Sequence, residues 1–214
     1  MRTLTGWGIV ITLLLVACGG AATALPTPAP PLAAVDTKSA PASSARGSAP
    51  AEQTTSITAV SLAKEFKDFP IQVYQGEDVL GGKNTQFSRL FGQGQPVVLN
   101  FFAGLCPPCR AEMPDFQTVS AQYQGRVLLF GLDIGPFVQL GSRDDGRALL
   151  KELGVTYPAG TTLDSKVVRS YQVLGMPTTV FLTPDGKVFR TWTGLLTRAK
   201  MVELFEQLLK ASGS

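Results

Sequence analysis

The chain has 214 residues, of which 44% are hydrophobic and 16% charged, and its formal net charge at neutral pH is +3. This length allows one domain with appendages or two small domains, and so small a charge excludes the basic surface of a nucleic-acid-binding protein. Histidine is absent from the whole sequence. Its absence excludes Cys/His zinc sites, Ser-His-Asp triads, Cys-His nucleophile pairs and copper sites that need an imidazole ligand.

Residues 1–18 resemble the signal peptide of a bacterial lipoprotein. Arg2 precedes an apolar stretch, Leu4–Val16, that is shorter than the about 20 residues of a bilayer-spanning helix and fits the core of a signal peptide. It ends in Leu-Val-Ala-Cys at Cys18, which resembles a lipobox, where the cysteine becomes the lipidated first residue after cleavage. The alternatives are an ordinary signal peptide with an incidental cysteine and a short uncleaved anchor. All three place the mature chain outside the cytoplasm, and the choice between membranes stays open.

Residues 19–56 are rich in Ala, Pro, Ser and Thr, and nearly free of aromatic and large aliphatic side chains. Prolines recur from Pro26 to Pro50 and disfavour both helix and sheet pairing. Such a segment cannot bury enough apolar surface to offset the entropy that it would lose on ordering. We therefore expect a disordered tether between a membrane anchor and a globular domain of residues 57–214.

Strand and helix patterns alternate within the globular part. The strands that we predict are apolar or alternating runs at 71–74, 97–102, 126–132, 178–182 and 188–192. The helical segments that we predict lie at 87–90, after the 97–102 strand, at 143–153, at 164–171 and around 201–209. We expect turns or loops at 76–82, at 184–187 and through Gly135, Pro136 and Gly141. This order predicts an α/β domain with a mixed sheet.

The helix predicted at 143–153 is closed by Gly154, and its apolar residues indicate which face is buried. We expect Ala148, Leu149 and Leu153 to face inward. In the last helix, Met201, Leu204, Phe205, Leu208 and Leu209 recur at helical spacing and predict an amphipathic helix that closes the domain.

Two cysteines separated by two prolines follow the 97–102 strand and begin a predicted helix. The free N–H groups and the dipole of that helix start favour a thiolate at Cys106, and the prolines between the cysteines suit a first turn. Cys109 lies about one turn deeper and can displace a mixed disulfide formed at Cys106. This predicts reversible thiol–disulfide exchange in which Cys106 attacks and Cys109 resolves. One alternative is a static disulfide that only cross-links the chain. Another is half of a zinc site, but residues 57–214 contain no further cysteine or histidine to complete it. We expect neither a metal nor another cofactor.

Two further positions are candidates for the same site. Glu112 lies three residues after Cys109 on one helix face, where its carboxylate can exchange a proton with the thiol or simply be solvated. Pro177 precedes a strand, which makes a cis Met176–Pro177 bond a candidate beside the usual trans loop. Pro114, within the helical pattern, predicts a kink.

The segment Val-Val-Leu-Asn-Phe-Phe-Ala-Gly-Leu-Cys-Pro-Pro-Cys-Arg-Ala-Glu-Met-Pro at 97–114 and Gly-Met-Pro-Thr-Thr at 175–179 resemble the thioredoxin fold. Within that fold they resemble the TlpA/ResA group of membrane-anchored, extracytoplasmic thiol–disulfide oxidoreductases. The resemblance covers roughly residues 66–211. We accordingly expect a thioredoxin-like fold, with a central mixed sheet flanked by helices and an N-terminal β extension.

This resemblance also implies roles for individual residues. Cys106 is the attacking thiol, Cys109 the resolving thiol and Glu112 the active-site carboxylate, and the Met176–Pro177 pair forms the cis-proline loop that faces the substrate. The chain departs from the family pattern twice: Leu105 stands where Trp is usual, and Asn100 stands where cytosolic thioredoxins carry a buried Asp. Leu105 changes the surface that faces the substrate. Because Asn100 is not an acid, Glu112 is the residue expected to act as the active-site carboxylate.

We therefore expect an extracytoplasmic, lipid-anchored reductase of disulfides in exported proteins, of the type used in cytochrome c maturation or metalloprotein assembly. Its partners would be protein thiols or disulfides and a membrane electron donor, and nucleic acid would not be one. A protein disulfide oxidase is an alternative, and so is a non-catalytic redox sensor or binding module with a structural disulfide. The Pro-x-x-x-Thr-x-x-Cys motif of thiol peroxidases is missing, because Leu99 and Ala103 occupy its first two defined positions.

Overall fold

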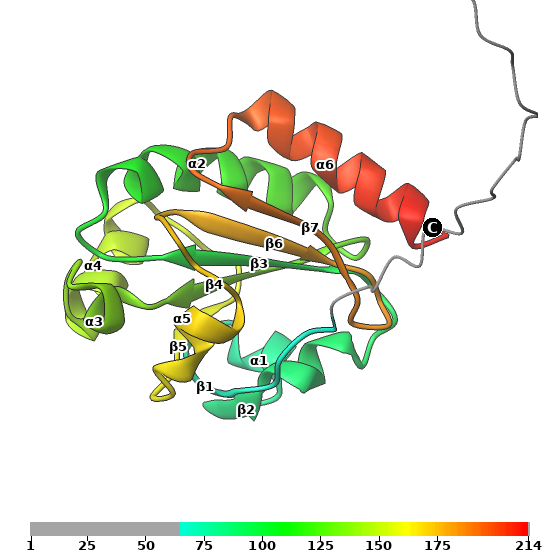
Figure 1. Cartoon of the computed structure of the whole chain (residues 1–214). Coiled ribbons are helices and arrows are strands. Elements are labelled where there is room, and N and C mark those ends of the chain that lie inside the picture. The colour runs from blue at the N-terminus through cyan, green and yellow to red at the C-terminus, as the bar shows by residue number, and fades with distance from the viewer. Residues whose placement is uncertain (1–64, 214) are drawn as a thin grey trace, which may run out of the picture. The chain divides into compact units, whose positions relative to one another are not determined.

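The computed structural model describes residues 65–213 (Figure 1). The predicted signal peptide with Cys18, the tether at 19–56 and the first residues of the predicted domain, 57–64, lie outside the described residues. Between residues 65 and 213, none of the helices combines the length and the apolar character needed to cross a membrane.

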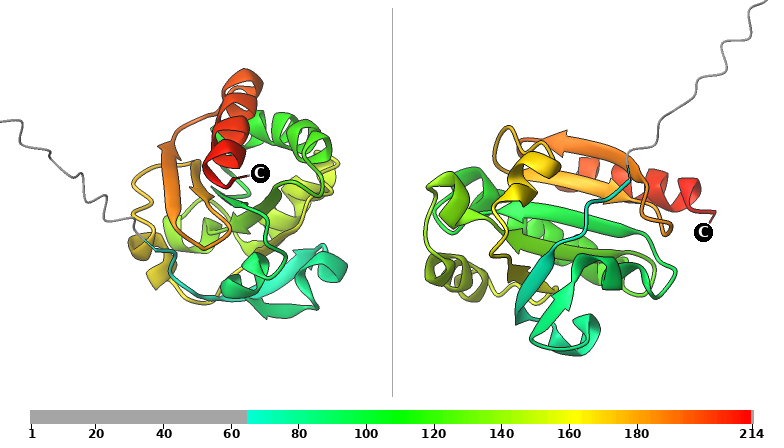
Figure 2. Two further views of the ribbon diagram at one scale, coloured as in Figure 1. Left: turned by 90° about the vertical axis from the view of Figure 1, so that its right-hand side faces the viewer. Right: turned by 60° about the horizontal axis from the view of Figure 1, so that its bottom comes forward.

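The described part of the chain forms one seven-stranded sheet with helices on both faces (Figures 1 and 2). Its strands are β1 (Pro70–Gln75), β2 (Asn84–Gln86), β3 (Val97–Phe102), β4 (Leu128–Asp133), β5 (Ala159–Thr161), β6 (Thr178–Leu182) and β7 (Val188–Thr193). The helical segments are α1 (Glu77–Leu80), η1 (Phe87–Phe91), α2 (Pro107–Gln122), α3 (Gly135–Val138), α4 (Arg143–Glu152), α5 (Lys166–Ser170) and α6 (Arg198–Ala211). The predicted α/β class is confirmed.

The sheet is mixed, and its strand order is β2-β1-β5-β4-β3-β6-β7. β3, β4 and β5 are parallel, whereas β6 is antiparallel to β3, and β1 is antiparallel to both β5 and β2. β1 and β2 are the predicted N-terminal extension. Because β6 runs against β3, the segment that enters β6 lies at the same edge of the sheet as the segment that leaves β3.

β3 is buried along its whole length and contributes side chains to two hydrophobic clusters, one on each face of the sheet. Val98 and Phe102 belong to the cluster under α2 and α6, which lie side by side above the sheet in Figure 1, whereas Leu99 and Phe101 belong to the cluster on the opposite face. Successive side chains of a strand point to opposite faces. Asn100 therefore faces α2, the helix that begins at the two cysteines.

The structure corrects some local predictions. In α4, Leu149 is buried as predicted, and Leu153 after the helix packs against the core, but Ala148 is exposed and Gly146 and Leu150 are buried instead. Gly146, in the first turn of α4, lies directly against the side chain of Asp133 at the end of β4. α1 and α3 are short helices within stretches that we predicted as turns or loops. The five predicted apolar positions of α6 are all buried, as expected.

Candidate redox site

The two cysteines form a disulfide across the first turn of α2. Cys106 is the N-cap residue of the helix, Pro107 and Pro108 occupy its first two positions, and the Cα atoms of the cysteines lie 5.3 Å apart. The backbone N–H of Cys109 points at the Cys106 sulfur, with an N···Sγ distance of 3.3 Å. This arrangement can stabilise a thiolate at Cys106, because a helix N-terminus favours negative charge and presents an unpaired donor.

The Met176–Pro177 peptide bond is cis and lies directly before β6. Phe101 pairs with Thr178, so Pro177 lies at the sheet edge from which the chain continues to the cysteines. The Thr178 hydroxyl donates a hydrogen bond of 2.7 Å to the carbonyl of Gly175, and the Pro177 carbonyl accepts one of 2.8 Å from the N–H of Gly194. These contacts hold the loop from both of its sides.

Glu112 is a buried carboxylic acid, with 1% of its surface exposed, on the second turn of α2. Its Oε1 accepts a hydrogen bond of 2.9 Å from the Asn100 side-chain amide, and its Oε2 accepts one of 3.0 Å from the backbone N–H of Leu196. Burial raises the pKa of Glu112 from its ordinary 4.5 to about 7, although both hydrogen bonds act in the opposite direction. A group with such a pKa can take up and release a proton near neutral pH.

The sequence singled out Asn100 but did not reveal that it and Leu196 donate hydrogen bonds to Glu112. The Asn100 amide also donates to the Thr179 hydroxyl, at 3.0 Å, so β3, β6 and α2 meet at this carboxylate. Leu196 follows β7 and contributes only its backbone N–H, which no side-chain pattern can signal. Thr179 was recognisable only as part of the Gly-Met-Pro-Thr-Thr segment.

The oxidised cysteines are poorly accessible. Cys106 is 2% exposed and Cys109 is fully buried, and both belong to the cluster against which Met176 packs. Leu105, at the position where the resemblance predicts Trp, is 61% exposed. An apolar side chain therefore stands at the surface next to the buried Cys106.

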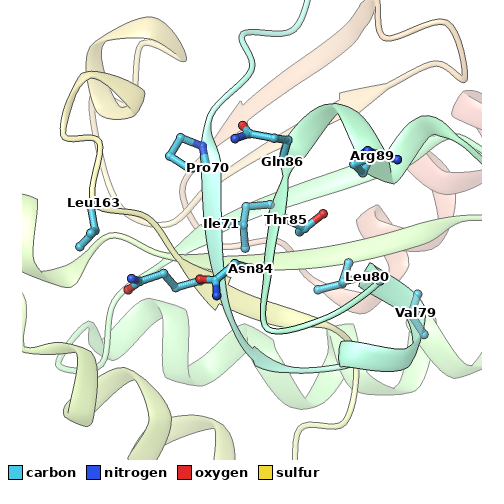
Figure 3. Close-up of a pocket in the computed structure, with 11 residues that line it drawn as sticks. Pro70, Ile71, Val79, Leu80, Asn84, Thr85, Gln86, Arg89 and Leu163 are labelled. Atoms are coloured by element: carbon cyan, nitrogen blue, oxygen red, sulfur yellow. The ribbon is translucent and has the colours of Figure 1, made fainter.

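A surface hollow lies elsewhere, on the N-terminal extension (Figure 3). Its lining includes Ile71, Val79, Leu80 and Arg89, together with Leu163 from the segment after β5. Neither the cysteines nor the residues that hold Glu112 contribute to it. The hollow is separate from the disulfide and is not part of the candidate redox site.

The chain is similar in sequence to known proteins. The AhpC/TSA family matches residues 62–190. The chain is 30% identical to the thiol-disulfide oxidoreductase ResA of Bacillus subtilis over 130 residues, which are 60% of this chain and 68% of ResA. It is 32% identical to ResA of Oceanobacillus iheyensis over 126 residues, which are 59% of this chain and 62% of that relative.

Solved structures show the same fold. The crystal structure of StoA from Bacillus subtilis superposes with a TM-score of 0.52 at 20% identity, covering 64% of this chain and 95% of StoA. The exposed lipoprotein thioredoxin Etrx1 of Streptococcus pneumoniae superposes with a TM-score of 0.55 at 21% identity, covering 66% of this chain and 99% of Etrx1. The chain thus belongs to the AhpC/TSA family of thioredoxin-like fold and, within it, to the thiol–disulfide oxidoreductases that include ResA.

Proposed function

We propose that the chain is anchored outside the cytoplasm by lipid at Cys18 and reduces disulfides of exported proteins through Cys106 and Cys109. The observation that carries the proposal is the Cys106–Cys109 disulfide across the start of α2, with the buried carboxylate of Glu112, whose pKa is raised to about 7, one turn further along the helix. The lipobox-like end of the apolar segment supports the anchor.

Reduction begins with the dithiol form. The Cys106 thiolate attacks one sulfur of a substrate disulfide, forms a mixed disulfide and releases the other substrate sulfur as a thiolate, which takes up a proton. Cys109 then loses its proton to Glu112 and attacks the Cys106 sulfur, which forms the Cys106–Cys109 disulfide, breaks the mixed disulfide and releases the second substrate sulfur as a thiolate that takes up the proton from Glu112. The substrate gains two electrons and two protons. A membrane electron donor must then return the chain to the dithiol form.

We assign the surface around Leu105 and the cis-proline loop, Met176 and Pro177, to contact with the substrate protein. Leu105 is exposed, and half-buried Met176 packs against the cluster that contains Cys106, so both offer apolar contact to a substrate protein. Proteins that present a cysteine pair next to apolar residues are the substrates that fit. The candidates that we propose are the haem-binding cysteines of apocytochromes and copper-assembly proteins.

The deciding experiment is a redox titration of the full chain with thiol trapping of Cys106 and Cys109. A reversible midpoint from about −230 mV down to about −300 mV would support a reductant, and one near −120 mV would identify an oxidant instead. No exchange at any potential would support the non-catalytic alternative, which the low exposure of Cys106 also suits. Thiol peroxidase activity is not expected, because Leu99 and Ala103 replace the residues that this chemistry uses.

A further inference from the structure

We propose that Asp133 is a positioning residue for Cys106, because its buried carboxylate fixes the segment between β4 and α4, which in turn holds the backbone before Cys106. The inference rests on the proposed role of Cys106 as the attacking thiol. Through the hydrogen bond from Tyr74 to Asp133, the N-terminal extension also helps to position Cys106.

Asp133 is the last residue of β4 and pairs with Phe102, the last residue of β3. Its side chain is fully buried. Oδ1 accepts a hydrogen bond of 2.9 Å from the N–H of Gly135, at the start of α3, and Oδ2 accepts one of 3.0 Å from the hydroxyl of Tyr74 in β1. The carboxylate therefore links the N-terminal extension to the segment that follows β4.

Two charged groups and two neutral hydrogen-bond donors act on this carboxylate. Arg143 and Arg147 of α4 and the hydrogen bonds from Gly135 and Tyr74 lower the pKa of Asp133, but burial outweighs them and raises it from 3.8 to about 6. The Arg147 guanidinium also lies 4.2 Å from the centre of the Tyr74 ring. A buried carboxyl group is tolerated only where polar and charged partners surround it, as they do here.

The first turn of α4 rests directly on the carboxylate. A Cβ atom at Gly146 would lie 2.1 Å from Oδ2 of Asp133, so only glycine allows this approach. The other side of the same turn touches Gly104, where a Cβ atom would lie 2.4 Å from the backbone carbon of Asp145. The turn is held between Asp133 and the chain that leads to Cys106.

The loop before α4 makes a second contact with that chain. The N–H of Leu105 donates a hydrogen bond of 2.9 Å to the carbonyl of Leu140, and the Leu105 side chain lies against Gly141. α3 and α4 accordingly lie at the end of the sheet where β3 leads into α2 (Figure 1). Gly104 and Leu105 are thereby fixed, and they determine where Cys106 begins the helix.

The test uses the full chain with two variants and a matched control. Asp133→Asn keeps the shape of the side chain but removes its charge and one acceptor. Tyr74→Phe removes only the hydroxyl that donates to Asp133. Tyr123→Phe is the control, since the Tyr123 hydroxyl also donates to a carboxylate, that of Glu206 at 2.6 Å, but at the opposite end of α2.

Two measurements separate positioning from stability. The first is hydrogen exchange of the Leu105 amide in the disulfide form, with the Leu128 amide, which donates to Pro96, as the internal reference. The second is the pKa of Cys106 in the dithiol form, from the pH dependence of its alkylation rate. We expect exchange at Leu105 to become about tenfold faster in Asp133→Asn and less so in Tyr74→Phe, with an unchanged rate at Leu128. We also expect a higher pKa of Cys106 in both variants and no change in Tyr123→Phe.

Equal acceleration at Leu105 and Leu128 would overturn the proposal, because it would show a general loss of stability. An unchanged pKa of Cys106 in both variants would overturn it too, whatever happens at Leu105. Failure of the wild-type chain to exchange disulfides with any protein substrate would instead refute the proposed function. The two measurements need no substrate protein and would still decide the positioning of Cys106.

Discussion

The side-chain amide of Asn100 donates a hydrogen bond of 2.9 Å to the carboxylate of Glu112, and both residues are buried beneath the start of α2. An amide at this position donates without adding a second negative charge. The buried carboxylate consequently has a neutral neighbour in β3, and desolvation is the main cause of its raised pKa.

The raised pKa of Glu112 predicts how its ionisation changes stability with pH. Between about pH 4.5 and 7 the folded chain holds a proton that the unfolded chain has released, so the contribution of Glu112 to stability falls as pH rises through this window. The loss amounts to about 3 kcal/mol. We expect Glu112→Gln to remove this dependence. Urea denaturation of the oxidised protein at pH 5 and pH 8 measures it, and equal pH slopes in both proteins would contradict the assignment.

Asn100→Asp tests whether Glu112 requires an uncharged neighbour in β3. The substitution puts a second carboxylate beside Glu112 and removes the donor to Glu112 and Thr179. We expect a loss of stability of about 3 kcal/mol at pH 8 and a smaller loss at pH 5, where a shared proton relieves the repulsion. Urea denaturation at pH 5 and pH 8 measures both losses of stability. A loss that is independent of pH would indicate that only the hydrogen bonds matter.

The assigned roles of the two cysteines predict different products. Cys109→Ser should accumulate mixed disulfides between Cys106 and substrate proteins, because no thiol remains to resolve them. Cys106→Ser should form no such adducts and should lose exchange altogether. Non-reducing gel electrophoresis followed by mass spectrometry identifies the adducts. If Cys106→Ser traps partners and Cys109→Ser does not, the order of attack is reversed.

Gly104→Ala should disturb the approach to Cys106. The added Cβ would lie 2.4 Å from the backbone of α4, which cannot move aside as a flexible side chain can. We expect a loss of about 2–4 kcal/mol in stability and slower disulfide exchange. Gly92→Ala is the control, since Gly92 has φ −65° and its Cβ would meet one backbone oxygen at 3.3 Å. Similar losses in the two variants would argue against a special contact at Gly104.

The lipid anchor predicts a change of location. Cys18→Ser should release the chain from the membrane fraction and abolish incorporation of a radiolabelled fatty acid. The thiol–disulfide exchange of the released protein should be unchanged, because Cys106 and Cys109 are intact. Fractionation of cells that express either form measures this. A variant that stays with the membrane and was never acylated would support the uncleaved anchor instead.

Local patterns in the sequence were sufficient for the elements that build the site. The apolar run of β3, the two prolines at the start of α2 and the helical spacing in α6 each act over a few residues, and the structure has all three elements. The Pro-Asp-Gly-Lys turn also joins β6 and β7 as predicted, with φ +79° at Gly186. Such features depend on neighbours in the sequence, and so a single chain reveals them.

The tertiary structure alone decided the surroundings of the two buried acids. The N–H of Leu196 reaches Glu112 across 84 residues, and the hydroxyl of Tyr74 reaches Asp133 across 59. In the sequence, Asp133 is only the residue that follows a predicted apolar strand. Ala148 was predicted to face inward, but it is exposed. Backbone donors and close glycine contacts carry no side-chain signal. Which partners a buried charge finds is set by strand order and helix packing, and these follow from the whole fold rather than from any one segment.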